Sequence, residues 1–244
     1  MSTETFDRIR AYYDGEFDVK VRDGKLEVSN VKPILGGGSN HDFKNDVLDE
    51  HLGVMTSYRW AHDPRTVLFM LSRYKFVAKM LEGYDRVLEV GCGDAFGSRL
   101  VRQSVKRLTA VDVDAQMIDD AKRRASVKWD ILYIMGDMSA LSERFDALYC
   151  LDVLEHVLPI EEGLFLTMAA KLAPVMIIGM PSLEAQVHAS PLSRENHVNC
   201  KSEEGLRTLM RKHFRHVFMF GMNDEMLHTG FGPMCHYRFA LGVN

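Results

Sequence analysis

The chain has 244 residues, 46% of them hydrophobic, with a formal net charge of −4 and a pI near 6.2. This length fits one α/β domain with an N-terminal extension. The acidic balance provides no basic patch for a nucleic-acid backbone, so we expect no nucleic-acid partner. The sequence shows no signal peptide, lipidation motif or apolar run of transmembrane length, and its four cysteines form no C-x-x-C pair. We therefore expect a cytoplasmic protein in reduced form with no membrane association.

The first 60 residues are predicted to be an irregular extension, and residues 61–244 to form the α/β domain. Within the extension, the pair Asp23-Gly24 lies between alternating segments of residues 19–28, which is typical of a hairpin. Gly36, Gly37 and Gly38 form a flexible stretch. Two interpretations remain open: a loosely packed segment, or a lid or dimer arm of a homodimer.

A helix is predicted from Asp63-Pro64, with Asp63 as N-cap and Pro64 at its first position. Gly83 is expected to end it. Its buried face is given by residues at helical spacing: Val67, Met70, Leu71, Tyr74, Ala78 and Leu81.

The most informative stretch, residues 87–101, reads VLEVGCGDAFGSRLV. A short apolar run ends in Gly91-Cys92-Gly93, and an amphipathic segment follows, so the order is strand, glycine turn, helix. Such a turn lets a ligand approach the backbone near free N–H groups of the helix. Gly97 makes the spacing G-x-G-x-x-x-G, which differs from the dinucleotide pattern G-x-G-x-x-G. Glu89 lies inside the strand, where a carboxylate suits a cationic ligand better than a pyrophosphate.

Two further strands are predicted to end in carboxylates. Residues 108–113 form an apolar run with Asp112, about 20 residues past the glycine turn, where an acid can accept both hydroxyl protons of a ribose. Residues 131–138 read ILYIMGDM and place Asp137 just beyond the next strand. Either acid alone could be a strand-end turn residue, but ligands of open α/β sheets bind at strand carboxyl ends.

Residues 145–157, FDALYCLDVLEHV, add a fourth strand with a D-x-L-x-H-V ending. These four motifs together resemble the class I S-adenosylmethionine-dependent methyltransferases, whose first motif is E/D-x-G-x-G followed by a helix. The resemblance implies an α/β, Rossmann-like fold with a seven-stranded, mostly parallel sheet and an antiparallel C-terminal strand. It also implies S-adenosyl-L-methionine as the methyl donor.

The resemblance places Asp137 at the adenine amino group and Met138 against the adenine ring. The pair Arg73-Tyr74 resembles an R-Y pair found in methyltransferases of glycan and natural-product pathways, where Arg73 would reach the methionyl carboxylate. Alternatives are a surface arginine beside a core tyrosine, and a structural role for Glu89. The full set of predicted donor-binding residues is Arg73, Tyr74, Glu89, Gly91, Cys92, Gly93, Asp112, Val113, Met117, Gly136, Asp137, Met138 and Leu151.

The acceptor site is expected in the polar connection of residues 183–201. The run ENHVNCKSEEGL resembles the family pattern H-h-x-x-x-[ST]-x-x-x-L, in which a histidine precedes a serine-capped helix; here these are His197 and Ser202. Candidate catalytic residues are His197, His156 and His188, of which His197 is preferred as general base. Structural roles remain open: His197 as a loop anchor, and His156 as a cap of the helix near Pro159.

Residues 216–222 and 234–243 are predicted to form a terminal antiparallel hairpin, which argues against a dehydrogenase with a separate substrate domain. No E-x-x-H or H-E-x-x-H spacing indicates a metal site, although carboxylates distant in sequence could still form one.

The favoured function is methyl transfer to an oxygen or nitrogen of a small polar metabolite: a sugar, a nucleotide-linked sugar, or a capsule or natural-product precursor. Two alternatives are a non-catalytic nucleoside-binding scaffold on the same fold and a nicotinamide-dependent oxidoreductase.

Overall fold

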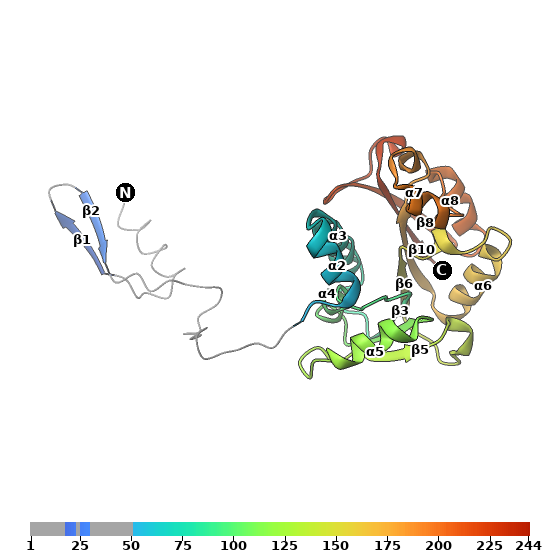
Figure 1. The fold of residues 1–244 in the computed structure, drawn as a ribbon, viewed down its shortest axis with the longest axis horizontal. Helices are drawn as coiled ribbons and strands as arrows, with labels where there is room; N and C mark the ends of the chain where they lie inside the picture. Colours follow the sequence, from blue (N-terminus) through green and yellow to red (C-terminus); the bar gives the residue numbers. More distant parts are fainter. Residues whose placement is uncertain (1–17, 23–24, 30–50) are drawn as a thin grey trace. The chain divides into compact units, whose positions relative to one another are not determined.

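The computed structural model describes residues 18–22, 25–29 and 51–244, and the chain divides into two units, residues 1–49 and 50–244. In the first unit, β1 (Asp18–Arg22) and β2 (Lys25–Ser29) pair antiparallel, as the Asp23-Gly24 pattern predicts (Figure 1). The glycines at 36–38 lie outside the described residues. The role of the extension as a lid or dimer arm stays a prediction.

The second unit is built on a sheet of eight strands in the order β5-β4-β3-β6-β7-β10-β8-β9. Strands β5, β4, β3, β6 and β7 are parallel neighbours, and β10 pairs antiparallel with both β7 and β8. The strands are β3 (Arg86–Val90), β4 (Arg107–Asp112), β5 (Leu132–Met135), β6 (Ala147–Leu151), β7 (Val175–Pro181), β8 (His216–Asn223), β9 (Met226–His228) and β10 (Tyr237–Val243). The predicted Rossmann-like sheet is thus confirmed.

The predicted count of seven strands is one short. The additional strand, β9, returns on β8 through a turn at Asp224, whose φ is +51°, and pairs antiparallel with it. A strand of three residues is too short to show a period-2 pattern, which is why it was not predicted.

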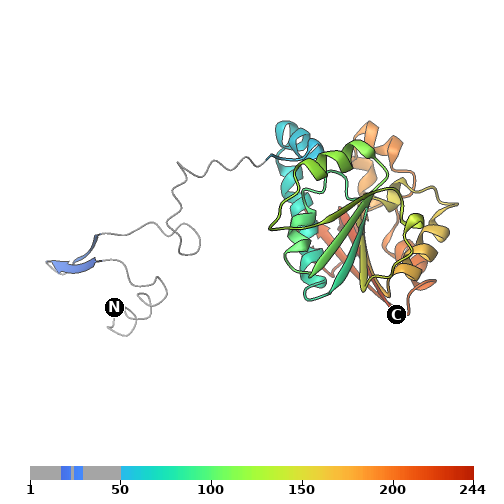
Figure 2. The same cartoon turned by 90° about the horizontal axis from the view of Figure 1, so that it is seen from below.

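Helices cover both faces of this sheet (Figure 2). One face packs against α3 (Arg65–Met80), α4 (Ser98–Arg102) and α5 (Ala115–Arg123), and the other against α6 (Glu162–Leu172) and α8 (Glu203–Arg211). Tyr149 and Ile177 of the central strands are completely buried, as expected where a parallel sheet is covered on both faces. Ser202 caps α8 by accepting a hydrogen bond from the Gly205 N–H, as predicted.

An unpredicted helix, α2 (Val54–His62), lies near the start of the second unit. The predicted boundary between residues 60 and 61 therefore falls inside a helix. Its N-cap residue, Gly53, offers no capping side chain. Instead Asp94 accepts the Thr56 N–H at 2.7 Å and Asp120 accepts the Val54 N–H at 3.2 Å. Both acceptors are distant in sequence, which explains why no local start signal was visible.

Helix α3 begins at Arg65, one residue later than predicted, with Pro64 rather than Asp63 at the N-cap. The Asp63 carboxylate instead accepts the Arg65 backbone N–H and pairs with its guanidinium at 2.9 Å. The predicted buried face is largely confirmed, since Val67, Met70, Tyr74 and Ala78 are buried and Leu71 is half-buried.

Because β3, β4, β5 and β6 are parallel, their carboxyl ends meet at one edge of the sheet. Gly91, Asp112, Gly136 and Asp152 lie at these four ends. Among the described residues, no helix combines the length and apolarity that a membrane span requires.

Candidate active site

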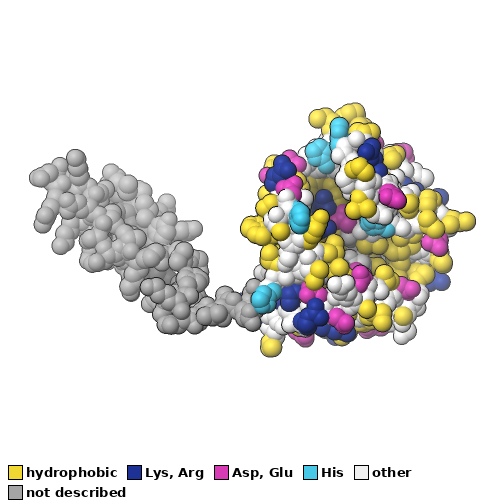
Figure 3. Space-filling model, in the orientation of Figure 1, with side chains coloured by type: hydrophobic (Ala, Val, Ile, Leu, Met, Phe, Trp, Pro, Cys, Tyr) yellow, Lys and Arg dark blue, Asp and Glu magenta, His cyan; other side chains and the backbone are white. Residues whose placement is uncertain are grey.

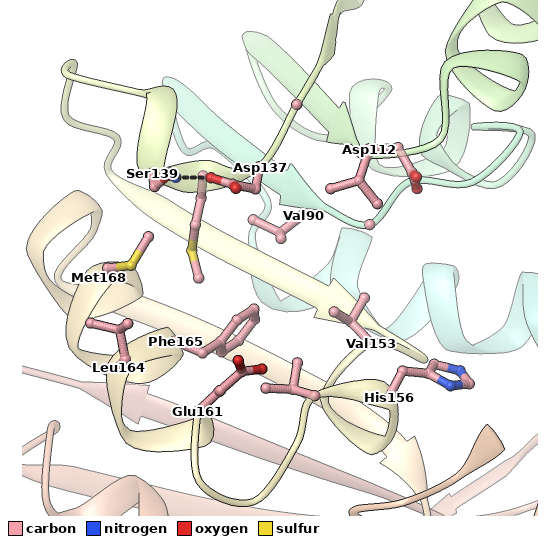
Figure 4. Close-up of a pocket in the computed structure, with 15 residues that line it drawn as sticks. Val90, Asp112, Asp137, Ser139, Val153, His156, Glu161, Leu164, Phe165 and Met168 are labelled. Carbon is pink, nitrogen blue, oxygen red and sulfur yellow. Dashed lines mark hydrogen bonds between the residues drawn. The ribbon is translucent and has the colours of Figure 1, made fainter. Parts of the chain in front are cut away.

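A cavity of about 550 Å³ opens at this edge of the sheet (Figure 4). That volume lies in the range of small-molecule and cofactor sites. Its lining residues come from the four strand ends and from α6: Val90, Gly91, Asp112, Val113, Gly136, Asp137, Met138, Ser139, Val153, His156, Val157, Glu161, Leu164, Phe165 and Met168. In the space-filling view of Figure 3, the surface of the second unit is hollowed on the face turned toward the reader.

The glycine turn forms the floor of the cavity. Gly91 and Gly93 have φ values of +75° and +53°, which L side chains rarely adopt. A Cβ at Gly91 would overlap the Val153 side chain, another lining residue. Glycine at this position therefore both permits the turn and keeps the cavity open.

Asp112 connects the turn to β4. Its Oδ2 accepts the Gly93 N–H at 2.7 Å, and its Oδ1 accepts the Asp114 N–H at 2.9 Å. A carboxylate can accept about four hydrogen bonds, so each oxygen retains capacity for a ligand hydroxyl. Asp112 is half-exposed and lines the cavity, which suits its predicted contact with a ribose diol.

Asp137 begins the short 3₁₀ segment η1 (Met138–Ala140), where its Oδ1 accepts the Ser139 N–H at 2.6 Å. Hydrogen bonds from Ser139 lower the pKa of the Asp137 carboxyl, so it is charged at neutral pH. Figure 4 shows this bond at the rim of the cavity. The second carboxylate oxygen is available to a ligand donor.

The opposite wall comes from α6 and the loop before it, and its side chains are apolar apart from Glu161. Leu164, Phe165 and Met168 lie across the cavity from Val90 (Figure 4), and Val157 and Met138 also line it. An apolar slot with a carboxylate at its rim fits a flat heteroaromatic ring that carries an amino group. The contribution of α6 to this wall was not predicted, because it depends on how α6 packs in the tertiary structure.

Several predicted donor-binding residues lie behind the cavity. Tyr74 is buried and donates its O–H to Glu89 Oε1 at 2.8 Å, and Glu89 itself is 1% exposed. Burial raises the pKa of the Glu89 carboxyl. Cys92, Leu151 and Met117 also do not line the cavity, and the first two are buried. Their roles in donor binding stay predictions.

Arg73 reaches the carboxyl end of β6. Its Nη1 lies 2.8 and 3.0 Å from the two Asp152 oxygens, and its guanidinium stacks 3.9 Å from the Tyr237 ring centroid. Asp152 has a φ of +57°, an uncommon conformation for a non-glycine residue. In the structure, Arg73 forms an ion pair with Asp152. Its role at a methionyl carboxylate stays a prediction.

Two of the three candidate histidines meet beside the cavity. His156 belongs to the 3₁₀ segment η2 (Leu154–His156), and its ring lies edge-on to His197 with centroids 5.2 Å apart. Burial lowers the pKa of His197, so its imidazole is neutral at physiological pH. His188 is exposed at the end of the 3₁₀ segment η3 (Glu184–His188) and does not line the cavity.

Glu155, next to His156, was missed as a site residue. It is fully buried, and its carboxylate oxygen lies within 4.8 Å of a ring nitrogen of both His156 and His197. The D-x-L-x-H-V run contained it, but its proximity to His197 depends on the tertiary fold.

A family model described as a methyltransferase domain matches residues 87–174, from β3 to the end of α6 and the two residues after it. This range contains the glycine turn, Asp112, Asp137 and His156. Residues 87–174 thus match a methyltransferase-domain family, and the fold is that of class I S-adenosylmethionine-dependent methyltransferases.

Solved structures agree with this methyltransferase fold. The methyltransferase domain of bacterial CtHen1-C superposes with a TM-score of 0.61 at 16% identity, over 72% of this chain and 99% of that one. Magnesium protoporphyrin IX methyltransferase from Synechocystis PCC 6803, crystallised with bound SAM, gives a TM-score of 0.55 at 18% identity, over 99% of this chain and 92% of that one.

Sequence relatives of the chain include two ubiquinone biosynthesis O-methyltransferases. The mitochondrial protein of Schizosaccharomyces pombe is 34% identical over 153 residues, which are 54% of this chain and 56% of that protein. The Methylocella silvestris protein is 35% identical over 94 residues, 37% of this chain and 36% of that protein. The chain thus spans about half, or less, of the curated relatives it matches.

Proposed function

We propose that the protein transfers the methyl group of S-adenosyl-L-methionine to a hydroxyl oxygen of a small molecule. The observation that carries this proposal is the cavity at the strand ends, which brings Gly91, Asp112 and Asp137 together beside an apolar slot. Its polar atoms and its shape match the parts of an adenosyl ligand.

The residues that would hold the donor fit it in chemistry. Asp112 has free acceptor capacity for two ribose hydroxyls, and Asp137 has a free oxygen for the adenine amino group. Met138, Leu164 and Phe165 supply apolar contact for the ring. When bound, the donor supplies a methyl carbon that is already electrophilic because its sulfur is a sulfonium.

The protein then has to position the acceptor and remove its proton. His156 lines the cavity and contacts His197, so this pair lies where the adenosyl slot meets the acceptor side. A neutral imidazole can accept the hydroxyl proton. A carbon–oxygen bond then forms as the carbon–sulfur bond breaks, and its electron pair remains on sulfur. Alignment of the acceptor oxygen with the methyl carbon is the main contribution of the protein.

An oxygen acceptor is favoured over a nitrogen acceptor because the two relatives described above are named as O-methyltransferases. Their names also indicate an aromatic hydroxyl as one candidate acceptor. The subgroup resemblance of Arg73-Tyr74 favours a sugar or nucleotide-linked sugar instead. We retain both acceptor classes within the proposal, since the same histidine pair can serve either.

The test is release of S-adenosylhomocysteine from the donor in the presence of two acceptor panels, one of catechols and hydroxybenzoates and one of sugars and nucleotide-linked sugars. We expect turnover with one panel, and methylated oxygen in the product by mass spectrometry. Donor binding without turnover on either panel would favour the scaffold alternative. Binding of NAD in place of the adenosyl ligands would favour the oxidoreductase.

A further inference from the structure

We propose that Glu155, His156 and His197 form a binding site for a divalent transition-metal cation at the acceptor side of the cavity. Among the described residues, one donor atom from each of these three side chains lies within 4.8 Å of the other two. Metal–ligand bonds of about 2.0–2.2 Å require donor atoms roughly 3–4 Å apart, so side-chain rotations moving these atoms by ~1 Å would complete the site.

Both histidine rings are already oriented as metal ligands usually are. His156 Nδ1 lies 3.0 Å from the carbonyl oxygen of Asn196, and His197 Nδ1 lies 3.1 Å from Gln186 Oε1. These oxygens can only accept, so each Nδ1 carries the proton and each Nε2 presents a lone pair. Metal-bound histidines typically donate their other ring N–H to a carbonyl or carboxylate in this way.

The burial of Glu155 supports the metal site independently of the orientation of the two histidines. Its side chain is fully buried, and neither of its carboxylate oxygens has a hydrogen-bond partner. An unpaired buried carboxylate is costly, and a bound cation is one of the few partners that would compensate it. Arg73, the nearby positive charge, makes its ion pair with Asp152 instead.

The donor set indicates the class of cation. Two imidazoles and one carboxylate suit Zn²⁺, Co²⁺ or Mn²⁺, whereas Mg²⁺ prefers oxygen ligands and bound water. Three protein ligands leave at least one coordination position open. If the proposed methyl transfer is correct, on which this consequence rests, that position would take the acceptor hydroxyl and make it more acidic. The histidines would then act as ligands rather than as the general base.

The experiment is titration of the untagged, chelator-treated full chain with Co²⁺, followed by visible absorption. We expect a saturable 1:1 increase in the absorption bands of nitrogen- and oxygen-bound Co²⁺, and its reversal by excess Zn²⁺. This readout does not require methyl transfer.

Three substitutions test the assignment: Glu155→Gln, His156→Ala and His197→Ala. Each is expected to weaken Co²⁺ binding at least tenfold. Gln186→Leu, which leaves the three ligands in place but removes the partner of His197 Nδ1, is expected to weaken it about tenfold or more. The matched control is His216→Ala, because His216 is exposed and lies at the opposite edge of the sheet, paired with Val243.

S-adenosylhomocysteine binding by each variant provides the fold control. Absence of saturable Co²⁺ absorption in a wild-type chain that binds this ligand would overturn the metal site and leave the proposed function standing. Equal Co²⁺ affinity in wild type and His197→Ala would also overturn it. Loss of adenosyl binding by the wild type with Co²⁺ binding intact would instead contradict the proposed function alone.

Discussion

Asp112 both stabilises the backbone near the glycine turn and lines the cavity. It holds the Gly93 and Asp114 backbone N–H groups, and it keeps acceptor capacity toward the cavity. The sequence could predict this residue because its position depends on one local unit, a strand that ends beside the glycine turn. The same holds for Asp137, which follows the next parallel strand.

We predict that Asp112→Ala weakens binding of S-adenosylhomocysteine about tenfold or more, since hydrogen bonds to a charged group contribute roughly 1.5–3 kcal/mol. Asp119→Ala is the control, because Asp119 is exposed on α5 and does not line the cavity. Isothermal titration calorimetry of both variants provides the comparison. Unchanged affinity in Asp112→Ala would remove the ribose assignment.

Glu155 shows where residue-level prediction failed. His156 and His197 were proposed individually, but their contact with each other and with Glu155 joins segments 41 residues apart along the chain from His156 to His197. No periodicity or local spacing records such a contact. The two histidines could therefore be predicted from the sequence, but their contact with each other and with Glu155 could not.

At the level of elements, the β3–α4 turn depends on the absence of a side chain at Gly91. We predict that Gly91→Ala lowers the stability of the fold by about 2 kcal/mol or more, because alanine is strained in the left-handed region and its Cβ would overlap Val153. Thermal or urea unfolding measures the loss.

Gly163→Ala is the matched control for that substitution. Gly163 lies near the start of α6, and a Cβ there would meet nothing within 4 Å. Since alanine favours a helix over glycine, this variant should be as stable as the wild type or more so. An equal loss of stability in both variants would contradict the steric account of Gly91.

Helix α2 depends on carboxylates from other elements. We predict that Asp94→Ala, which leaves the buried Thr56 N–H without its acceptor, costs about 1–3 kcal/mol and raises hydrogen exchange over residues 54–62. Asp85→Ala, which removes an exposed ion pair with Arg107, is the control and should leave that exchange unchanged. Unaltered protection in Asp94→Ala would show that α2 is held by other contacts.

The helices and strands that could be predicted from the sequence have a clear hydrophobic periodicity and residues that mark where they end. Strands β3 to β6 are apolar runs that end at glycine or aspartate, and α3 has a clear buried face. Helix α2 begins without a local cap, and β9 has only three residues, so neither carries such a signal. Tertiary contacts determine both.

At the scale of the whole domain, the sheet order places the donor and acceptor sides next to each other. Strand β6 lies between β3 and β7, so the segment after β6, Val153 to Val157, faces the glycine turn on one side and His197 on the other. One short segment thereby joins the adenosyl slot to the histidine pair. This arrangement makes donor binding the central requirement of the proposed function.

The most direct measurement is therefore calorimetric titration of the full chain with S-adenosylmethionine, S-adenosylhomocysteine and NAD in parallel. We predict micromolar binding of both adenosyl ligands and no binding of NAD. Absence of binding by either adenosyl ligand would contradict the proposed methyl transfer and leave the cavity as a structural feature of the fold.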